Sequence, residues 1–313
     1  MRPSPRADVI KPFLTGQDIN QRPLQRSERF AIDLDGMPEE KARVYKACWE
    51  WLYNTVRIQR QGNKIASRER FWWQYIGRQE GLYSAIAGFT RVLGCGQVSK
   101  YWAVSWLEPG QVFADKVVVF ALSSDAHFAV LNSCFHTEWA EKTSSRLKDD
   151  PNYNLAKTFE TFPFPVENSS LNGIGDSFHA QRQQCMRSRL EGLTSIYNRL
   201  HDDSESSADI SRLRALQKEM DHTVAAAYGW NDLDLKHDFY ITAQGVRYTI
   251  CDDARRAVLD HLLALNHKCY LEETSSGSVR SRTKNQVRKS HKNGGGSQDK
   301  SNQNALFIAE DLK

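Results

Sequence analysis

The clearest pattern of hydrophobic and polar positions lies between residues 116 and 165. Residues 117–122 (VVVFAL) form an unbroken apolar run rich in β-branched side chains, which is typical of a strand buried on both faces. Ser123, Ser124 and Asp125 end the run and offer oxygen atoms that can cap a helix. Apolar side chains then recur at helical spacing at positions 128, 131, 135 and 139, so we predict one helix that packs on the strand.

Beyond Trp139 the helical pattern ends. Residues 142–148 read KTSSRLK, and these cations and short hydroxyls suit no hydrophobic core, so we expect an exposed loop. Residues 159–165 read FETFPFP, with three aromatic side chains set between prolines, which we interpret as a structural strap at a domain junction. The strand and helix are therefore expected to present a cationic, hydroxyl-rich loop at one place.

Shorter elements are expected before this unit. Residues 30–34 alternate as a strand, and a helix is expected over residues 37–56, with proline early and acids in its first turn. We predict no leading strand or helix in residues 8–20, and two short strands between residues 90 and 107. The side chains expected to face inward from the helix are Val44, Ala47, Trp51 and Leu52.

Residues 57–70 are dense in arginine, glutamine, lysine and asparagine, and they lead into the aromatic run FWWQY at residues 71–75. One interpretation is a solvated loop followed by an aromatic cluster in the core. The other is a cationic and aromatic surface that binds nucleic acid. Both interpretations stay open at the level of sequence.

Helical spacing dominates after residue 165. Residues 170–202, 209–228 and 252–271 each predict helical structure, Gly229 ends the second helix, and residues 239–250 predict a β-hairpin. The inward face of the first helical stretch is expected to hold Phe178, Met186, Leu190, Leu193, Ile196 and Tyr197.

The predicted fold class is α+β. We expect a mixed α/β domain over residues 1–165 and a mostly helical domain with a small β-hairpin over residues 166–273. Residues 274–313 are rich in serine, glycine, asparagine and basic residues with almost no apolar content, which predicts a disordered basic tail.

Composition narrows the class of protein. The 313 residues include 42 Lys and Arg against 38 Asp and Glu, and the net charge of +4 permits a polyanionic partner without requiring one. The six cysteines form no CxxC pair, which favours a reducing cytoplasm over a disulfide framework. We expect a cytoplasmic protein without a membrane partner, because the sequence shows neither a signal peptide nor an apolar run long enough to span a bilayer.

Two short motifs resemble parts of a methyltransferase. RVLGCG at residues 91–96 resembles the glycine-rich loop that lies against S-adenosylmethionine, but such a loop must open a helix, and residues 98–106 alternate as a strand. DPNY at residues 150–153 resembles the Asp/Asn-Pro-Pro-Tyr/Phe motif of amino-methyltransferases, but it lacks the second proline. We therefore expect no catalytic residue, no bound cofactor and no metal in this chain, since His127, Cys134 and His136 match no usual zinc spacing.

Several long segments of the sequence, which occur in the same order as in a known family, resemble that family. ADVIKPFLTGQDIN, RERFWWQYIGR, QVSKYWAVSWL, VVVFALSSDAHFAVLNSCFHTEWA and FETFPFP are similar to the specificity half of MmeI-like (type IIL/IIG) restriction-modification proteins. EGLTSIYNRLHD, DISRLRALQKEMDHTVAAAYGW and GVRYTICDDARRAVLDHLLALNH resemble the helical part that follows it. In that family one chain carries an adenine-N6 DNA methyltransferase domain, a target recognition domain and a helical C-terminal domain.

The resemblance implies that the methyltransferase domain lies before residue 1 and is missing from this sequence. That domain would bind S-adenosylmethionine, and the partners implied are double-stranded DNA and a methyltransferase domain or subunit. The chain is then expected to be a split subunit, a truncation or a pseudogene product that is not catalytic by itself. A self-sufficient methyltransferase using S-adenosylmethionine and an inactive fragment are the alternatives.

Sequence recognition requires side chains that match base edges and cations that contact phosphates. Residues 97–101, expected on a strand with alternating faces, and residues 142–148 with Asn152 supply this mixture. The resemblance implies that base specificity lies in the loop after the Trp139 helix. The candidate DNA contacts are Arg91, Gln97, Ser99, Lys100, Tyr101, Lys142, Thr143, Ser144, Ser145, Arg146, Lys148 and Asn152.

Overall fold

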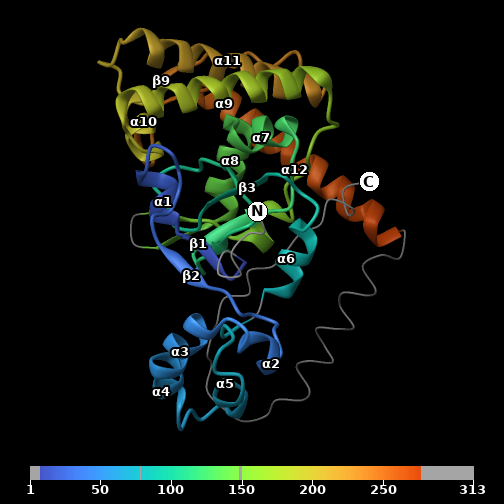
Figure 1. Cartoon of the computed structure of the whole chain (residues 1–313). Helices are drawn as coiled ribbons and strands as arrows, with labels where there is room; N and C mark the ends of the chain where they lie inside the picture. The colour runs from blue at the N-terminus through green and yellow to red at the C-terminus, as the bar shows by residue number, and fades with distance from the viewer. Residues whose placement is uncertain (1–7, 78, 148–149, 276–313) are drawn as a thin grey trace.

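The computed structural model of the chain describes residues 8–77, 79–147 and 150–275. Its fold is α+β, as predicted, with small sheets near the centre and helices packed around them (Figure 1). A three-stranded antiparallel sheet lies in the core, and β3 pairs with both β4 and β6. Its strands are β3 (Val92–Gly96), β4 (Ser105–Leu107) and β6 (Val117–Phe120).

Strand β6 confirms the buried strand predicted from the apolar run, since every residue of β3 and β6 is buried. Gly94 allows the strands to approach closely, because a Cβ atom there would lie 2.3 Å from Leu107 Cδ1 and 2.7 Å from the Val118 carbonyl oxygen. Gly94 and Gly96 thus lie inside a strand. They do not open a helix, which a cofactor loop of the methyltransferase type requires.

The single helix predicted after this strand is wrong: the chain forms two helices, α7 (Asp125–Asn132) and α8 (Cys134–Thr143). Ser133 separates them with an extended backbone, and its hydroxyl accepts a hydrogen bond from the His136 backbone N–H. Serine competes with helix continuation in this way because its side chain can cap a new N-terminus.

The loop predicted over residues 142–148 is also wrong in part. Helix α8 continues through Thr143, and the chain then forms an antiparallel hairpin of β7 (Ser145–Leu147) and β8 (Asp150–Asn152). Residues 148–149, including the candidate Lys148, lie outside the described residues. Lys142 and Thr143 therefore belong to α8, whereas Ser145 and Arg146 are carried by the first strand of a β-ribbon.

The aromatic strap packs as predicted. A short π-helix, η1 (Leu155–Phe159), precedes it, and Phe159 and Phe162 are buried in the main core. The strap is held by the later helices, because Tyr228 donates to the Pro163 carbonyl oxygen and Asn266 donates to the Thr161 carbonyl oxygen, each at 2.7 Å.

The prediction of no leading element is wrong. Strand β1 (Ile10–Leu14) pairs antiparallel with β2 (Phe30–Ile32) and parallel with β5 (Val112–Phe113). Helix α1 (Gly16–Gln21) follows β1 and begins with a capping box between Thr15 and Asp18. One partner of β1 lies about 100 residues away along the chain, so the local sequence gives little sign of this strand.

Residues 37–76 form a small helical unit at one end of the molecule (Figure 1). The single helix predicted here is wrong, and Val44 and Trp51, expected inside, are 67% and 57% exposed. Trp72 and Trp73 are buried, which confirms the aromatic core cluster, whereas part of residues 57–70 is helical rather than a loop. The helices here are α2 (Glu39–Ala42), α3 (Lys46–Asn54), α4 (Val56–Arg60) and α5 (Ala66–Arg70), and α6 (Glu80–Ile86) follows.

The C-terminal part contains the predicted helices and hairpin. Its first helical stretch breaks at Leu190, which has a left-handed backbone (φ 55°) and is 80% exposed, so its predicted inward position is wrong. Gly229 ends the second helix with φ 78°, as predicted. The elements are α9 (Ser169–Arg189), α10 (Leu193–Leu200), α11 (Ala208–Ala227), β9 (Asp238–Thr242), β10 (Gly245–Thr249) and α12 (Asp252–Ser275).

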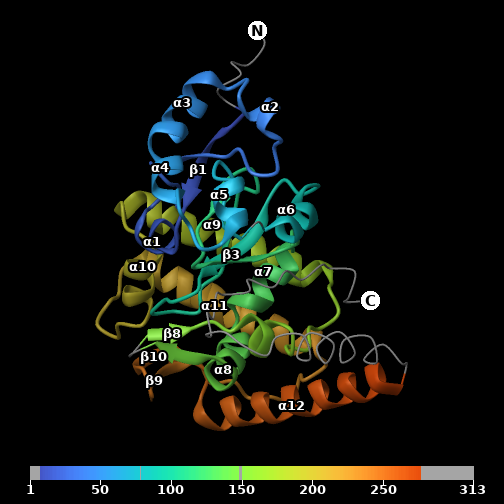
Figure 2. The same cartoon turned by 90° about the horizontal axis from the view of Figure 1, so that it is seen from below.

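One hydrophobic core continues across residue 165. Helix α9 packs on α7 so closely that a Cβ atom at Gly175 would lie 2.1 Å from the Asp125 carbonyl oxygen. Figure 2 shows α9 and α11 beside the elements of the first part. The domain boundaries expected at residues 165 and 273 stay predictions. The disordered tail expected from residue 274 begins too early, because helix α12 continues through Ser275, and residues 276–313 lie outside the described residues. No described helix has the length and apolar character needed to cross a membrane.

Candidate nucleic-acid interface

The structure brings together the two segments that carry most of the candidate residues. The Ser99 N–H donates to the Pro151 carbonyl oxygen at 3.2 Å, and the Tyr153 N–H donates to the Gln97 carbonyl oxygen at 2.8 Å. Val98 and Asn152 form an isolated β-bridge between these two contacts. The β7–β8 hairpin therefore lies directly beside residues 97–101.

The prediction that residues 97–101 form a strand with alternating faces is wrong. Within the stretch expected to alternate, regular pairing begins only at Ser105, where β4 starts. Because Val98 pairs at one isolated bridge, the following side chains are not directed by a sheet. Lys100 is exposed whereas Tyr101 is only 8% exposed, and tertiary contacts hold both in place.

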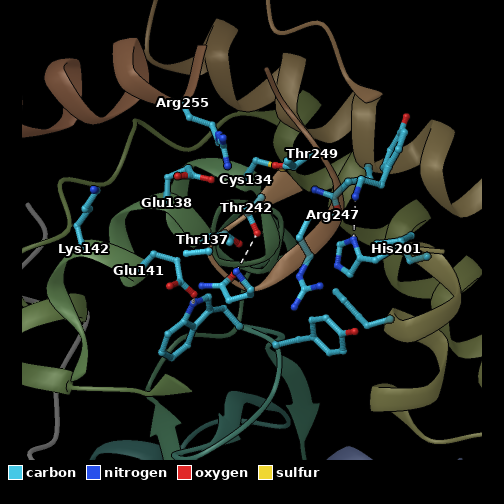
Figure 3. Close-up of a pocket in the computed structure, with 18 of the residues that line it drawn as sticks. Cys134, Thr137, Glu138, Glu141, Lys142, His201, Thr242, Arg247, Thr249 and Arg255 are labelled. Carbon is cyan, nitrogen blue, oxygen red and sulfur yellow. Dashed lines mark hydrogen bonds between the residues drawn. The ribbon is translucent and has the colours of Figure 1, made fainter. Parts of the chain in front are cut away.

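A cleft of about 520 Å³ opens next to these segments (Figure 3). Its walls come from residues 100–102, α8, α10, the β9–β10 hairpin and the first turns of α12. Four candidates line it: Lys100, Tyr101, Lys142 and Arg146.

Lys100 and Tyr101 are fixed by one side chain of helix α10. The Asn198 Oδ1 atom accepts hydrogen bonds from Lys100 Nζ at 2.6 Å and from the Tyr101 hydroxyl at 2.8 Å. Tyr101 also packs on the rings of Tyr197 and His201. The orientation of these two candidates thus depends on the C-terminal part of the chain.

Helix α8 supplies the acidic wall of the cleft. Glu141 accepts from Arg146 at 3.1 Å and also from Trp102 Nε1, so it holds the arginine and the indole together. Glu138 lies one turn earlier, and burial raises the pKa of its carboxyl to about 7, against the lowering effect of Arg255. Lys142 is exposed in the last turn of α8.

The hydroxyl groups of the candidate residues Thr143, Ser144 and Ser145 form hydrogen bonds within the protein. Thr143 donates to the Trp139 carbonyl oxygen at 2.8 Å, and its Oγ1 lies 3.0 Å from the Thr158 Oγ1 atom. Ser144 Oγ lies 2.7 Å from the same Thr158 atom. These bonds tie the end of α8 to η1. Ser145, which is exposed, accepts a hydrogen bond from Asn152 across the hairpin at 3.0 Å.

Arg91 and Gln97 are placed differently from the residues of the cleft. Arg91 forms an ion pair with Asp125 at 2.7 Å, and its guanidinium lies 3.8 Å from the Trp106 ring centroid. Gln97 carries a buried Oε1 atom without a hydrogen-bond partner. Arg91 therefore braces the start of β3 against α7.

The histidines considered as metal ligands do not gather with Cys134. His136 is buried and bonds the Tyr153 hydroxyl at 2.9 Å, and burial lowers the pKa of its ring to about 4. A different group, Cys134, Asp221 and His237, places its ligand atoms within 4.8 Å of one another. In that group Asp221 already accepts hydrogen bonds from the Cys134 N–H at 2.7 Å and from His237 at 2.8 Å, which links α8 to α11.

Comparison with known families identifies the N-terminal half. The family described as MmeI, target recognition domain, matches residues 2–166. The chain belongs to this family. The resemblance of the sequence words to MmeI-like proteins is thereby confirmed. A comparison with curated proteins finds no match.

The fold is also similar to a solved structure of MmeI. That structure is described as "Structure of Type IIL restriction-modification enzyme MmeI in complex with DNA has implications for engineering of new specificities". The TM-score is 0.55 at 16% identity, and the similarity covers 84% of this chain and 31% of that chain. This chain therefore spans about a third of the MmeI chain. Because 84% exceeds the share of residues 2–166, the shared fold extends into the C-terminal part.

All candidate residues lie within the part matched by the MmeI family, whereas the cleft extends beyond that part. Sequence reasoning missed His201, Gln244 and Arg247, which form its other wall, and Asn198, which holds Lys100 and Tyr101. Burial first, and then the charges of Arg247, Arg214 and Lys100, lower the pKa of the His201 ring to about 3. No spacing in the sequence relates these residues to Lys100, so only the fold reveals them.

Proposed function

We propose that this chain is the DNA sequence-recognition portion of an adenine-specific (N6) restriction-modification methyltransferase. The observation that carries the proposal is the contact between residues 97–101 and the β7–β8 hairpin, in a chain of the MmeI target recognition family. This contact gathers cations, amides and hydroxyls on one surface. Such a mixture suits base edges and phosphates together.

The hairpin has a shape that suits the major groove of DNA, which admits a two-stranded β-ribbon. Arg146 extends from β7 and is 41% exposed, and its planar guanidinium matches guanine O6 and N7. Asn152 on β8 carries an amide of the kind that pairs with adenine. Lys142 and Lys100, as exposed cations beside the ribbon, suit phosphate contacts that set the register.

The chemistry of methyl transfer is assigned to a methyltransferase domain or subunit outside this chain, which would bind S-adenosylmethionine. The two motifs in this chain that resemble its binding site do not fit. Gly94 and Gly96 lie inside β3, and residues 150–152 form strand β8 of a hairpin. Gly94 and Gly96 therefore open no helix toward a ligand. A cytoplasmic location is part of this proposal, because double-stranded DNA is the proposed partner.

The test is selection from a pool of random duplexes by the purified chain, followed by sequencing of the bound fraction. We expect enrichment of a short motif and no methyl transfer from labelled S-adenosylmethionine by the chain alone. Binding that ignores sequence, or no binding at all, would contradict the recognition role. Calorimetry with S-adenosylmethionine addresses the alternative of a self-sufficient enzyme, which requires measurable binding to this chain.

A further inference from the structure

Two cations from distant parts of the chain share one aromatic ring. Lys100 Nζ lies 5.3 Å from the centroid of the Tyr101 ring, and the Arg247 guanidinium lies 5.1 Å from the same centroid. Lys100 belongs to the target recognition part, whereas Arg247 lies on β10 in the C-terminal part. The fold thus places both cations around the Tyr101 ring, at one wall of the cleft.

Neither cation is neutralised by an acid in the part of the chain that the structure describes. Lys100 donates to Asn198 Oδ1, which is uncharged, and Arg247 donates to the Val246 carbonyl oxygen at 2.9 Å. The acids of the cleft lie elsewhere: Figure 3 shows Arg247 beside His201, with Glu138 and Glu141 across the cleft. The acidic wall is engaged by other partners, since Glu141 holds Arg146 and Trp102.

His201 lies at the same wall, and besides its burial the nearby cations disfavour a positive charge on its ring. His201 packs on Tyr101 with a centroid distance of 5.2 Å and accepts a hydrogen bond from the Tyr248 N–H at 3.1 Å. Its ring is kept neutral by burial and by Arg247, Arg214 and Lys100, which together lower its pKa. Arg214 itself donates to the last carbonyl oxygens of α10 and nearby turns. An anion bound at this wall would be attracted by both Lys100 and Arg247.

We propose that Lys100 and Arg247, which lie around the Tyr101 ring, form a phosphate-binding site that holds a backbone phosphate of DNA lying on the β7–β8 hairpin. This inference rests on the proposed function. DNA is the favoured source of the phosphate because the site continues directly from the hairpin, through the Ser99 to Pro151 hydrogen bond. Arginine and lysine donors can both reach one phosphate, and the guanidinium can do so with two N–H groups.

The site gives the C-terminal part a role in DNA binding. In this proposal Arg247 contacts the DNA backbone, so it fixes the position of the protein along the DNA and does not read bases. Asn198 is a positioning residue, because it orients Lys100 and Tyr101 through its Oδ1 atom.

The first experiment measures duplex affinity of the full chain as a function of salt for Arg247→Gln, Lys100→Gln and a matched control, Arg26→Gln. Arg26 is exposed and pairs with Glu108 outside the cleft. We expect each cleft variant to lose about tenfold in affinity for all sequences alike and to lower the salt slope by about one, with the selected motif unchanged. Arg26→Gln should match the parent chain. Arg247→Lys should recover part of the loss.

The outcomes separate this site from the proposed function. If the parent chain binds its motif and Arg247→Gln binds it equally well with the same slope, the phosphate site is wrong and the recognition role stands. If the parent chain binds no duplex, the phosphate site is tested with inorganic phosphate. Phosphate should raise the melting temperature of the parent chain but not that of Arg247→Gln. An equal effect on both chains, or no effect on either, would overturn the site. Tighter binding of ATP than of duplex would overturn DNA as the source of the phosphate.

Discussion

Arg146 and Lys142 differ in how the protein holds them. Arg146 is anchored by Glu141, whose second oxygen accepts from Trp102, so the guanidinium has a defined direction. Lys142 is exposed at the end of α8, with a flexible stem that suits a point contact to phosphate. The anchored arginine is therefore the better base-reading candidate. Ser144 is a weaker one, because its hydroxyl already bonds Thr158.

We predict that Arg146→Ala relaxes specificity at one base position, at a cost of about 1–3 kcal/mol for the preferred base. Lys142→Ala serves as the comparison and should weaken all sequences alike. The measurement is affinity for duplexes that vary one base pair at a time. If Arg146→Ala keeps the full specificity of the parent chain, Arg146 does not read bases, and residues 97–101 become the main candidate.

Glu138 should make stability depend on pH. Its pKa in the folded chain is raised to about 7 from the usual 4.5, so the folded state binds more protons than the unfolded state between these values. Its contribution to stability is present below pH 4.5 and is lost as pH rises through 7. We predict that the free energy of unfolding of Glu138→Gln, taken relative to that of the parent chain, is about 1–2 kcal/mol higher at pH 8 than at pH 5. Urea unfolding at both pH values measures this, and an equal difference at both would contradict it.

Two of the predicted helices are interrupted, one at Ser133 and one at Leu190, and the two interruptions have different causes. At Ser133 a hydroxyl caps the new helix α8, which is a favourable signal in the sequence. At Leu190 the chain takes a left-handed backbone with a leucine, which costs energy because its Cβ atom crowds the following carbonyl. The second break is thus imposed by the packing of α10 after α9.

The Leu190 position predicts a stabilising substitution. Leu190→Gly should raise the free energy of unfolding by about 1 kcal/mol, because glycine adopts φ 55° without strain and the leucine side chain is 80% exposed. Arg187→Gly, in the exposed helical turn just before, should instead lower it by about 1 kcal/mol. Thermal unfolding of both variants distinguishes the signs, and destabilisation by Leu190→Gly would show that its side chain packs favourably.

Arg182 joins the two halves of the molecule. It is fully buried on α9, donates to the Val104 carbonyl oxygen at 2.8 Å and to Asn132 Oδ1 at 3.0 Å, and lies against the Phe128 ring. The target recognition part therefore completes its core with a helix that the MmeI family match does not include. Such a shared core favours unfolding of both parts in one transition.

We predict that Arg182→Met lowers the free energy of unfolding by about 2 kcal/mol, because buried acceptors lose their donor. Arg187→Met, exposed on the same helix, should change it by less than about 0.5 kcal/mol. Far-ultraviolet circular dichroism and tryptophan fluorescence should report the same midpoint for the parent chain. Two separated transitions would show that the halves unfold independently.

Local patterns in the sequence determined the elements whose causes are local. The apolar run gave the buried strand β6, the glycine at position 229 ended α11, and the alternation before and after residues 243–245 produced the β9–β10 hairpin. The words that resemble MmeI-like proteins likewise identified the family from sequence. These signals are carried by neighbouring residues, so they need no knowledge of the rest of the fold.

Only the tertiary structure decided the features that depend on distant partners. Strand β1 exists because β2 and β5 pair with it, and residues 97–101 meet the β7–β8 hairpin through contacts about 50 residues apart along the chain. Arg247 lies against the Tyr101 ring because the β9–β10 hairpin folds back onto the first half. Such pairings depend on how whole helices and strands pack into one core. Residues that meet only through this packing show no periodic pattern in the sequence from which their contact could be predicted.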